Sequence, residues 1–192
     1  MLIAWLIAAY LCGALPWSVW LGRLFFRADP RQQSDGNPGA ANAFRAAGWR
    51  LGIAVLLLDF LKALLPVLVA YRGIGFQDAE MLLIALMPTL GHAFSVFLGL
   101  RGGRAIVVMF GVWTALTLYS VPLVMGITAI AATLLTRKDT VRTLAIPVVL
   151  LLYLMVQSAP GWMLALAVGQ MLVMVIKISA ARWLPKSGKS AT

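Results

Sequence analysis

The chain has 192 residues, of which 62% are apolar and only 11% are charged. A soluble domain carries roughly a quarter of charged residues, so this composition excludes an ordinary water-solvated globule and predicts a membrane protein. The net charge of +10 would raise nucleic acid as a partner of a soluble protein. No basic, aromatic-laced surface segment accompanies it, so we attribute the charge to cytoplasmic loops and anionic lipid headgroups, and we expect no nucleic-acid partner.

The first apolar run, from Met1 to Trp20, is expected to remain as a span. It has no basic n-region and does not end in a small-x-small cleavage site, which a signal peptide would need. Its cysteine, Cys12, is the only one in the chain, which excludes an intrachain disulfide and a cysteine metal site. No cluster of carboxylates or histidines has ligand spacing, so we expect no metal and no cofactor.

Apolar runs taken in chain order predict about seven transmembrane helices. The first is interrupted by Gly13 and Pro16, and a polar stretch over 27–50 follows it. The run over 105–135 is too long for one span. We expect a break near Ser120-Val121-Pro122, where proline removes a helix donor, and therefore a short fourth helix and a fifth span. The predicted spans are 2–26, 51–71, 81–100, the two helices within 105–135, 143–157 and 161–178.

Positive charge occurs in every second connection, which is the pattern of cytoplasmic loops. The basic residues of these connections are Arg27, Arg31, Arg45 and Arg50, then Arg101 and Arg104, then Arg137, Lys138 and Arg142, and finally Lys177, Arg182, Lys186 and Lys189. The predicted fold is therefore all-α: a polytopic transmembrane helical bundle of about seven spans, with the N-terminus outside and the C-terminus cytoplasmic. We expect one transmembrane domain over 1–184 and a basic cytoplasmic tail over 185–192.

The polar stretch after the first span has a composition that suits an anion. Its glycines, such as Gly36, allow positive φ, and consecutive backbone N–H groups can then form a concave nest. Asn37 and Asn42 add neutral donors, and Arg45 adds a positive charge. The same composition is typical of a plain turn-rich linker, so both interpretations stay open.

A second polar segment, Arg101-Gly102-Gly103-Arg104, is predicted on the same side of the membrane and opens a helix. Backbone N–H groups at a helix start together with two arginines suit a phosphate. The alternative is an ordinary basic turn at the cytoplasmic side. Because two such segments share one side, the pattern favours an anionic substrate.

The second and third predicted spans contain the ionisable residues Asp59, Lys62 and His92. Asp59 and Lys62 are three apart, so they share a helical face and can pair. Such residues are costly in a membrane and usually face the protein interior. The pair would then either serve a substrate or neutralise itself and fix helix packing. His92, the only histidine, is either a packing residue or a base.

These residues, in this order, resemble the bacterial acyl-phosphate:glycerol-3-phosphate acyltransferases. The motifs that carry the resemblance are Gly13-Ala14-Leu15-Pro16, Arg23, Asp29-x-Arg31, Gly36-Asn37-Pro38-Gly39-Ala40-x-Asn42-x-x-Arg45, Asp59-x-x-Lys62, Gly91-His92, Arg101-Gly102-Gly103-Arg104 and Thr136-Arg137. The resemblance implies a multi-pass enzyme of the bacterial inner membrane, surrounded by membrane lipids. It would move a fatty acyl group from acyl phosphate to the 1-hydroxyl of glycerol 3-phosphate in phospholipid synthesis.

The resemblance also implies roles for individual residues. It implies catalytic roles for Asn37, His92 and Arg104. The residues implied to contact substrate or phosphate are Asp35, Gly36, Asn42, Arg45, Lys62, Gly102, Gly103, Thr140 and Thr143. Acyl phosphate is already activated, so catalysis can rest on positioning and on stabilising charge at the attacked carbonyl. The lack of a lipase-type G-x-S-x-G motif agrees with this.

Several positions depart from the family pattern. Asp35 stands where the family has serine, and a carboxylate about 4 Å from a phosphate charge is repulsive by on the order of 4 kcal/mol at an effective dielectric of about 20. The departure is tolerable if Asp35 turns away or pairs with an arginine. Arg104 replaces a lysine, and Ala41 replaces a threonine. In the C-terminal block over 176–184, only an arginine and a leucine match the family.

Three functions are consistent with this pattern. The first is a divergent acyltransferase that uses glycerol 3-phosphate or a related phosphorylated acceptor. The second is a catalytically impaired relative that binds lipid or a protein partner. The third is a small transporter, which broken helices and charges within the membrane would suit, although no inverted repeat is visible.

Overall fold

The computed structural model describes residues 1–183, and these contain helices and no strands. The basic tail predicted over 185–192 lies outside the described residues. The α-helices are α1 (Leu2–Ala14), α2 (Trp17–Phe25), α3 (Ala40–Leu68), α4 (Asp78–Ala93), α5 (Ile106–Thr117), α6 (Ser120–Leu135), α7 (Asp139–Val156) and α8 (Gly161–Trp183). Short helical turns are η1 (Pro30–Gln32), η2 (Val69–Ile74) and η3 (Val96–Leu98). The predicted all-α class is confirmed for this part of the chain.

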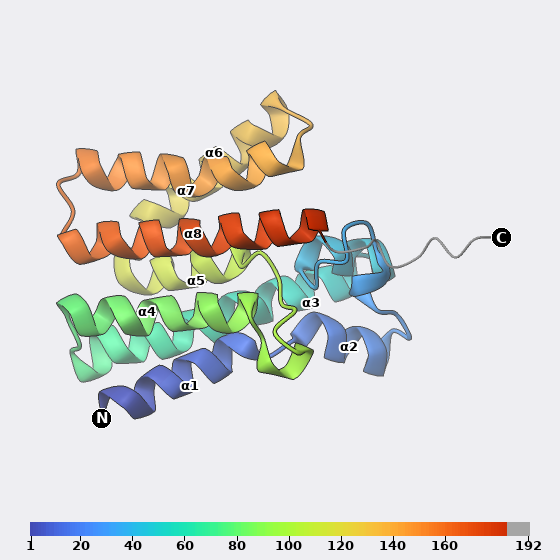
Figure 1. The fold of residues 1–192 in the computed structure, drawn as a ribbon, viewed down its shortest axis with the longest axis horizontal. Coiled ribbons are helices and arrows are strands. Elements are labelled where there is room, and N and C mark those ends of the chain that lie inside the picture. Colours follow the sequence, from blue (N-terminus) through green and yellow to red (C-terminus); the bar gives the residue numbers. More distant parts are fainter. Residues whose placement is uncertain (184–192) are drawn as a thin grey trace.

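The helices lie side by side along the long axis of the molecule, and their connections alternate between its two ends (Figure 1). The N-terminus and the α3–α4 and α7–α8 connections lie at one end. The opposite end is formed by residues 26–39, 99–105 and 136–138, which we call the polar end. The polar segments that the charge pattern assigned to one side therefore do share one end of the bundle.

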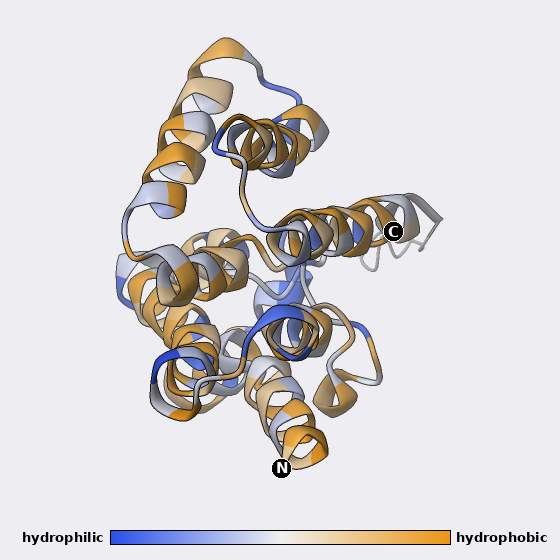
Figure 2. Cartoon of the chain, turned by 90° about the vertical axis from the view of Figure 1, so that its left-hand side faces the viewer, coloured by the Kyte–Doolittle hydropathy of each residue, from blue (hydrophilic) through white to orange (hydrophobic). Residues whose placement is uncertain are grey.

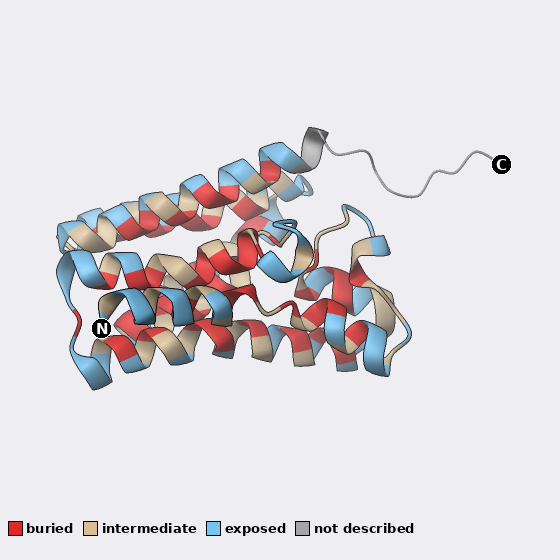
Figure 3. Cartoon of the chain, turned by 60° about the horizontal axis from the view of Figure 1, so that its bottom comes forward, coloured by how far each residue is buried: buried red, intermediate tan, exposed pale blue. Residues whose placement is uncertain are grey.

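Four helical segments are long and apolar enough to cross a membrane, or five if the bent pair α1–α2 is one span. The four are Ala40–Ile74, Asp78–Leu98, Asp139–Val156 and Gly161–Ala180. Helices α5 and α6 are apolar but shorter. Apolar residues predominate along the helices (Figure 2), and exposed residues lie on their outer faces while buried ones lie between them (Figure 3). An apolar outer face of this kind suits lipid rather than water.

The first helix is packed tightly against α4 because glycines remove side chains from their contact. A Cβ at Gly13 would overlap the backbone of Pro88, and a Cβ at Gly91 would overlap the carbonyl oxygen of Tyr10. Small residues let membrane helices approach closely and gain packing contacts. Farther along the core, the buried Gln170 of α8 accepts from Trp113 of α5 at 2.8 Å and donates to Thr89 of α4 at 3.1 Å.

Replacing Gly91 with alanine is expected to lower the unfolding free energy by about 1–3 kcal/mol or more, because the methyl group would push α1 away from α4. Thermal unfolding in detergent measures this. Gly126→Ala is the matched control, since the nearest atom to a Cβ there, Phe110 Cε1, is 4.0 Å away. Equal unfolding midpoints for the two variants would contradict the tight α1–α4 contact.

Two predicted boundaries are wrong, those at the starts of α3 and α7. Helix α3 begins at Ala40, with an internal kink at Ala47 and Gly48, so part of the predicted polar stretch is helical. The break predicted near Ser120-Val121-Pro122 is confirmed, because α5 ends at Thr117 and α6 begins at Ser120. Proline costs little there because it lies in the first turn of α6, where N–H groups have no helical partner anyway. Helix α7 begins at Asp139, not at residue 143.

Candidate active site

The site is built around the break between α1 and α2. Pro16 interrupts the helix, so carbonyl groups at the C-terminal end of α1 lack helical partners. Side chains from two other helical segments supply the missing donors. Ser95 Oγ donates to the carbonyl oxygen of Ala14 at 2.5 Å, and Lys62 Nζ donates to that of Leu15 at 2.8 Å. The break therefore holds α3 and the end of α4 in a defined position.

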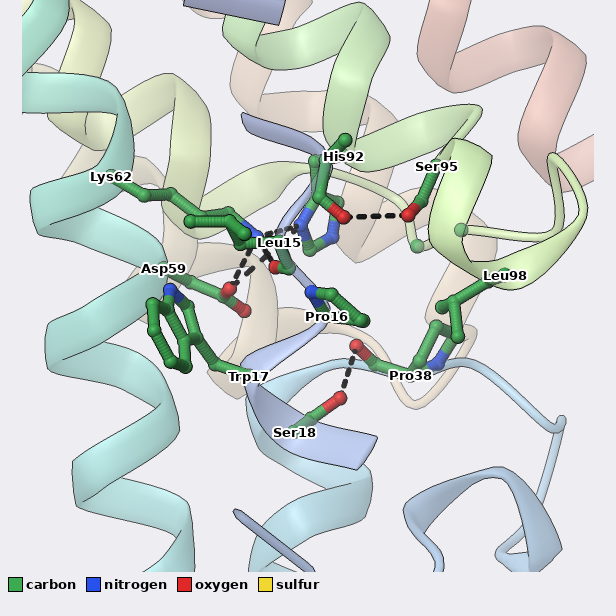
Figure 4. Close-up of a pocket in the computed structure, with 13 residues that line it drawn as sticks. Leu15, Pro16, Trp17, Ser18, Pro38, Asp59, Lys62, His92, Ser95 and Leu98 are labelled. Atoms are coloured by element: carbon green, nitrogen blue, oxygen red, sulfur yellow. Dashed lines mark hydrogen bonds and ion pairs between the residues drawn. The ribbon is translucent and has the colours of Figure 1, made fainter. Parts of the chain in front are cut away.

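Lys62 is the centre of a buried cluster (Figure 4). Its Nζ lies 2.6 Å from Asp59 Oδ1, so the pairing predicted from their spacing is confirmed. The same Nζ lies 3.0 Å from His92 Nδ1. With Leu15 as the third partner, all three N–H groups of the ammonium are engaged. This arrangement leaves Lys62 no N–H group directed at a phosphate.

The segment Gly102-Gly103 lies directly against His92. The backbone N–H of Gly103 donates to the His92 carbonyl oxygen at 3.0 Å, and that of Gly102 donates to Ala93 at 3.1 Å. A Cβ at Gly103 would overlap His92 Nε2 and would lie 3.1 Å from Asn37 Oδ1. Glycine is therefore required at Gly103 because it keeps the space between His92 and Asn37 open.

Asn42 organises the first polar segment. It is 2% exposed, and its Nδ2 donates to the carbonyl oxygens of Gln33 and Asn37 and to Asp35 Oδ1, at 3.1, 3.0 and 2.9 Å. Its Oδ1 accepts from Arg45 at 2.6 Å. These bonds already use the amide of Asn42, so in this arrangement it shapes the segment that presents Asn37.

Arg104 joins the first two segments of the polar end to the start of α7. Its guanidinium donates to Asp35 Oδ2 at 2.6 Å and also contacts Asp139 Oδ2 at the start of α7. The Arg104 side chain is 17% exposed, whereas Asp139 is 68% exposed. The two departures from the family pattern, Asp35 and Arg104, therefore pair with each other. This is one of the two conditions under which a carboxylate at position 35 is tolerable.

A second arginine cluster anchors the beginning of the first polar segment. Asp29 is nearly buried and accepts from Arg31 at 2.7 Å and from Arg23 at 2.9 Å. The hydrogen bond from Arg31 is the main cause that lowers the pKa of Asp29 from 3.8 to about 2. A lowered pKa in the folded state means that the ionised carboxylate stabilises the fold.

The contribution of Asp29 is expected to be complete above about pH 4 and to disappear as the pH falls towards 2, because the group is protonated through that window. The loss is about 2 kcal/mol for a shift of this size. Unfolding midpoints recorded across this pH range measure it. At neutral pH, Asp29→Asn should be less stable than Asp78→Asn, the control at the opposite end of the bundle. On acidification, Asp29→Asn should lose less stability than Asp78→Asn. Parallel pH curves for the two variants would contradict the assignment.

A cavity of about 160 Å³ opens beside the buried cluster around Lys62. It is lined by Asn37, His92 and Arg104, by Asp59, and by the first residues of α3 and α5. Neither helix start has a side-chain cap, so backbone N–H groups there remain available to an anion. The Asp59 carboxylate is paired with Lys62, and the other polar side chains around the cavity are the Arg104 guanidinium, the Asn37 amide and the His92 ring. A phosphate or a developing oxyanion suits such a wall.

The structure brings together most of the residues implied by the resemblance, but not all. Asn37, His92 and Arg104 line one cavity, with Gly103 beside it. Thr140 and the buried Thr143 lie in the first turns of α7, and Thr143 shares a helical face with Asp139. No contact joins them to the cavity in the described part of the chain. Gly36 has φ +72, as a turn glycine.

Sequence reasoning missed two contributors. Asp139 was overlooked, although it is the only acidic residue in an otherwise basic connection. Ser95, which donates to the broken helix, carries no signal in the sequence. Lys177 of α8 is half-buried, and its Nζ lies 5.2 Å from the centroid of the Phe94 ring.

The fold and the site define a multi-span membrane protein with a polar-lined cavity at one end of its bundle. A family model described as glycerol-3-phosphate acyltransferase matches residues 3–184, which is nearly the whole chain. The chain therefore belongs to the glycerol-3-phosphate acyltransferase family, as the sequence resemblance predicted.

Solved structures agree. The chain superposes with a TM-score of 0.85 and 27% identity on PlsY, an integral membrane glycerol 3-phosphate acyltransferase, in its glycerol 3-phosphate form, covering 93% of this chain and 88% of that one. The lysophosphatidic acid form gives a TM-score of 0.81 at 26% identity, covering 95% and 91%.

Curated relatives match over shorter regions. A glycerol-3-phosphate acyltransferase of an Anaeromyxobacter species (strain Fw109-5) is 45% identical over 113 residues, which cover 57% of this chain and 56% of the relative. One from Enterococcus faecalis is 41% identical over 57% of this chain and 50% of the relative. The matched region thus spans about half the length of these relatives. One from Maridesulfovibrio salexigens is 33% identical over 67% of this chain and 68% of the relative.

Proposed function

We propose that this protein is a membrane acyltransferase of phospholipid synthesis that moves a fatty acyl group from acyl phosphate to glycerol 3-phosphate or a closely related phosphorylated acceptor. The observation that carries the proposal is the cavity of about 160 Å³ where Asn37, His92, Arg104 and two uncapped helix starts meet. Membership of the family and the likeness to a structure in its glycerol 3-phosphate form support it.

The reaction forms an ester bond between the acceptor hydroxyl oxygen and the acyl carbon, and it breaks the bond from that carbon to the phosphate oxygen. The proton of the acceptor hydroxyl leaves with the released phosphate, which balances the step. The acyl donor is activated, so no enzyme nucleophile is required. What the transition state needs is donors aimed at the carbonyl oxygen and at the departing phosphate, where negative charge grows. These donors would come from Asn37, His92 and Arg104.

The remaining residues would contact the ligands at the cavity entrance or would position the residues that line the cavity. Arg45 is exposed and one turn from Asn42, so it would meet a phosphate at the entrance. Asp35 would set the position of Arg104, and Thr140 and Thr143 would approach an acceptor from α7. Asn42 and Lys62, whose hydrogen bonds are already used, would position Asn37 and His92.

The topology completes the proposal. The four long helices, the bent pair α1–α2, and α5 and α6 would give a chain of seven crossings. The N-terminus would lie outside and the polar end in the cytoplasm, because that end carries the basic connections. The membrane would be the bacterial inner membrane, where soluble glycerol 3-phosphate reaches the polar end directly.

Phosphate release from an acyl phosphate by the detergent-purified protein tests the function. Release that depends on glycerol 3-phosphate, and that falls by about 10²-fold or more in Asn37→Ala, is expected for an amide donor to a developing charge. Asp78→Asn, at the opposite end of the bundle, is the control and should retain activity. Glycerol 3-phosphate dependence that persists in Asn37→Ala would contradict the assigned cavity.

A catalytically impaired relative that binds lipid or a protein partner is the alternative function. One observation favours it: the Arg104 guanidinium is already held by Asp35 and Asp139. On this alternative, the wild-type protein releases no phosphate with any acceptor, whereas the double variant Asp35→Ser/Arg104→Lys does. Turnover by the wild-type protein excludes the alternative.

A further inference from the structure

His92 presents its two ring nitrogens to different surroundings. Nδ1 lies 3.0 Å from Lys62 Nζ within the buried cluster. Nε2 lies on the other side of the ring, next to Gly103 and Asn37, where the cavity opens. The identity of the nitrogen that carries the proton therefore decides whether the cavity faces a hydrogen-bond donor or an acceptor.

Lys62 determines this choice because an ammonium group has three N–H donors and no acceptor. Its partner Nδ1 must accept, and a neutral imidazole then carries its single proton on Nε2. Asp59 does not compete for the ring, since its Oδ1 is 3.9 Å from Nδ1 but 2.6 Å from Lys62 Nζ. A proton on Nδ1 would instead direct an N–H group at a cation 3.0 Å away.

We infer that Lys62 is a positioning residue that holds His92 in the Nε2–H tautomer, so that His92 offers a donor to the cavity. Nε2 makes no hydrogen bond to residues 1–180, whose side chains the structure describes. In the same part of the chain, no side-chain N or O atom that is fully buried lacks a partner. Nε2 therefore reaches open space, and its N–H is available to a ligand.

The consequence is that His92 cannot accept a proton at the cavity, which excludes it as the base that its sequence position suggested. The tautomer follows from the apo geometry alone. Which oxygen receives the Nε2–H bond, a phosphate or a carbonyl, rests on the proposed function. The role of Lys62 also explains why a costly charge pair is retained in the interior of a membrane bundle.

His92 is the only histidine in the chain, so labelling with ¹⁵N-histidine yields the signals of one residue, provided that no histidine tag is present. A two-bond ¹H–¹⁵N correlation spectrum of the detergent-solubilised protein distinguishes Nε2–H, Nδ1–H and imidazolium. At neutral pH and without substrate, we expect protonated Nε2 and unprotonated Nδ1. A spectrum of the Nδ1–H form or of imidazolium overturns the inference whether or not the protein has acyltransferase activity.

The double variant Asp59→Asn/Lys62→Met separates positioning from packing, because it removes the ammonium without leaving an unpaired buried carboxylate. The Nε2–H preference should be replaced by the Nδ1–H form or by exchange between the two. The matched control, Lys138→Met at an exposed position, should leave the spectrum unchanged. If a folded double variant retains the wild-type tautomer, Lys62 does not set it. If the variant fails to fold, the wild-type spectrum alone decides.

Discussion

Replacing Lys62 with methionine is expected to lower the free energy of unfolding by about 3–5 kcal/mol. The substitution leaves the Asp59 carboxylate inside the bundle without its counter-charge, and the Asp59 and Lys62 side chains are each only 3% exposed. It also leaves the carbonyl oxygen of Leu15 without its donor at the α1–α2 break. Chemical or thermal unfolding in detergent, followed by circular dichroism, measures the loss.

The double variant Asp59→Asn/Lys62→Met should recover most of that stability. With both charges removed, the remaining cost is that of neutral polar groups, which is smaller than that of an unpaired ion. Lys138→Met makes the same substitution at an exposed lysine and should change stability by less than about 0.5 kcal/mol. If Lys62→Met were as stable as Asp59→Asn/Lys62→Met, the Asp59 carboxylate would not be a buried charge that depends on Lys62.

Arg104→Gln is expected to reduce kcat/KM for glycerol 3-phosphate by about 10²-fold or more, because it removes the charged donor of the proposed cavity. Asp139→Asn should act in the opposite direction. Asp139 is largely exposed, and among the described residues its side chain forms a hydrogen bond and ion pair only with Arg104. Releasing the guanidinium from one carboxylate lowers the cost of engaging a phosphate, so KM should fall severalfold with little change in kcat.

Steady-state phosphate release at varied glycerol 3-phosphate measures both effects. Asp78→Asn makes the Asp139 substitution at the opposite end and should leave KM unchanged. Raising ionic strength should narrow the difference between wild type and Asp139→Asn, since an exposed ion pair is screened by salt. An unchanged or higher KM in Asp139→Asn would show that Asp139 assists phosphate binding and does not compete with it.

The pairing of Asp35 with Arg104 changes how the departures from the family pattern should be understood. Taken separately, each departure should weaken phosphate binding. At position 35 a carboxylate replaces a hydroxyl, and at position 104 a bulkier guanidinium replaces an ammonium. In the structure, the carboxylate satisfies the guanidinium and also accepts from Asn42 at 2.9 Å, so the two substitutions depend on each other. The single variants Asp35→Ser and Arg104→Lys should therefore each lose more stability than the double variant Asp35→Ser/Arg104→Lys.

The sequence by itself determined the helical architecture, the position of the polar segments and the Asp59–Lys62 pair. Hydropathy depends on local composition, and a spacing of three residues determines which side chains share a helix face, so neither needs tertiary information. The predicted helix boundaries were wrong where turn-forming residues lie inside a helix. Asn42 was assigned to a loop because its neighbours are turn residues, although helix α3 already includes it.

Only the tertiary structure decided which groups meet at the site. The contact between Arg104 and Asp35 joins residues 69 apart, and that between Lys62 and His92 joins residues 30 apart. Both depend on packing around the α1–α2 break and around glycines whose lack of a side chain lets backbones approach. No local pattern encodes such distances, since they arise from helices that pack together only when the whole bundle has formed. The chemistry of the site, including the tautomer of a single histidine, is set at that level.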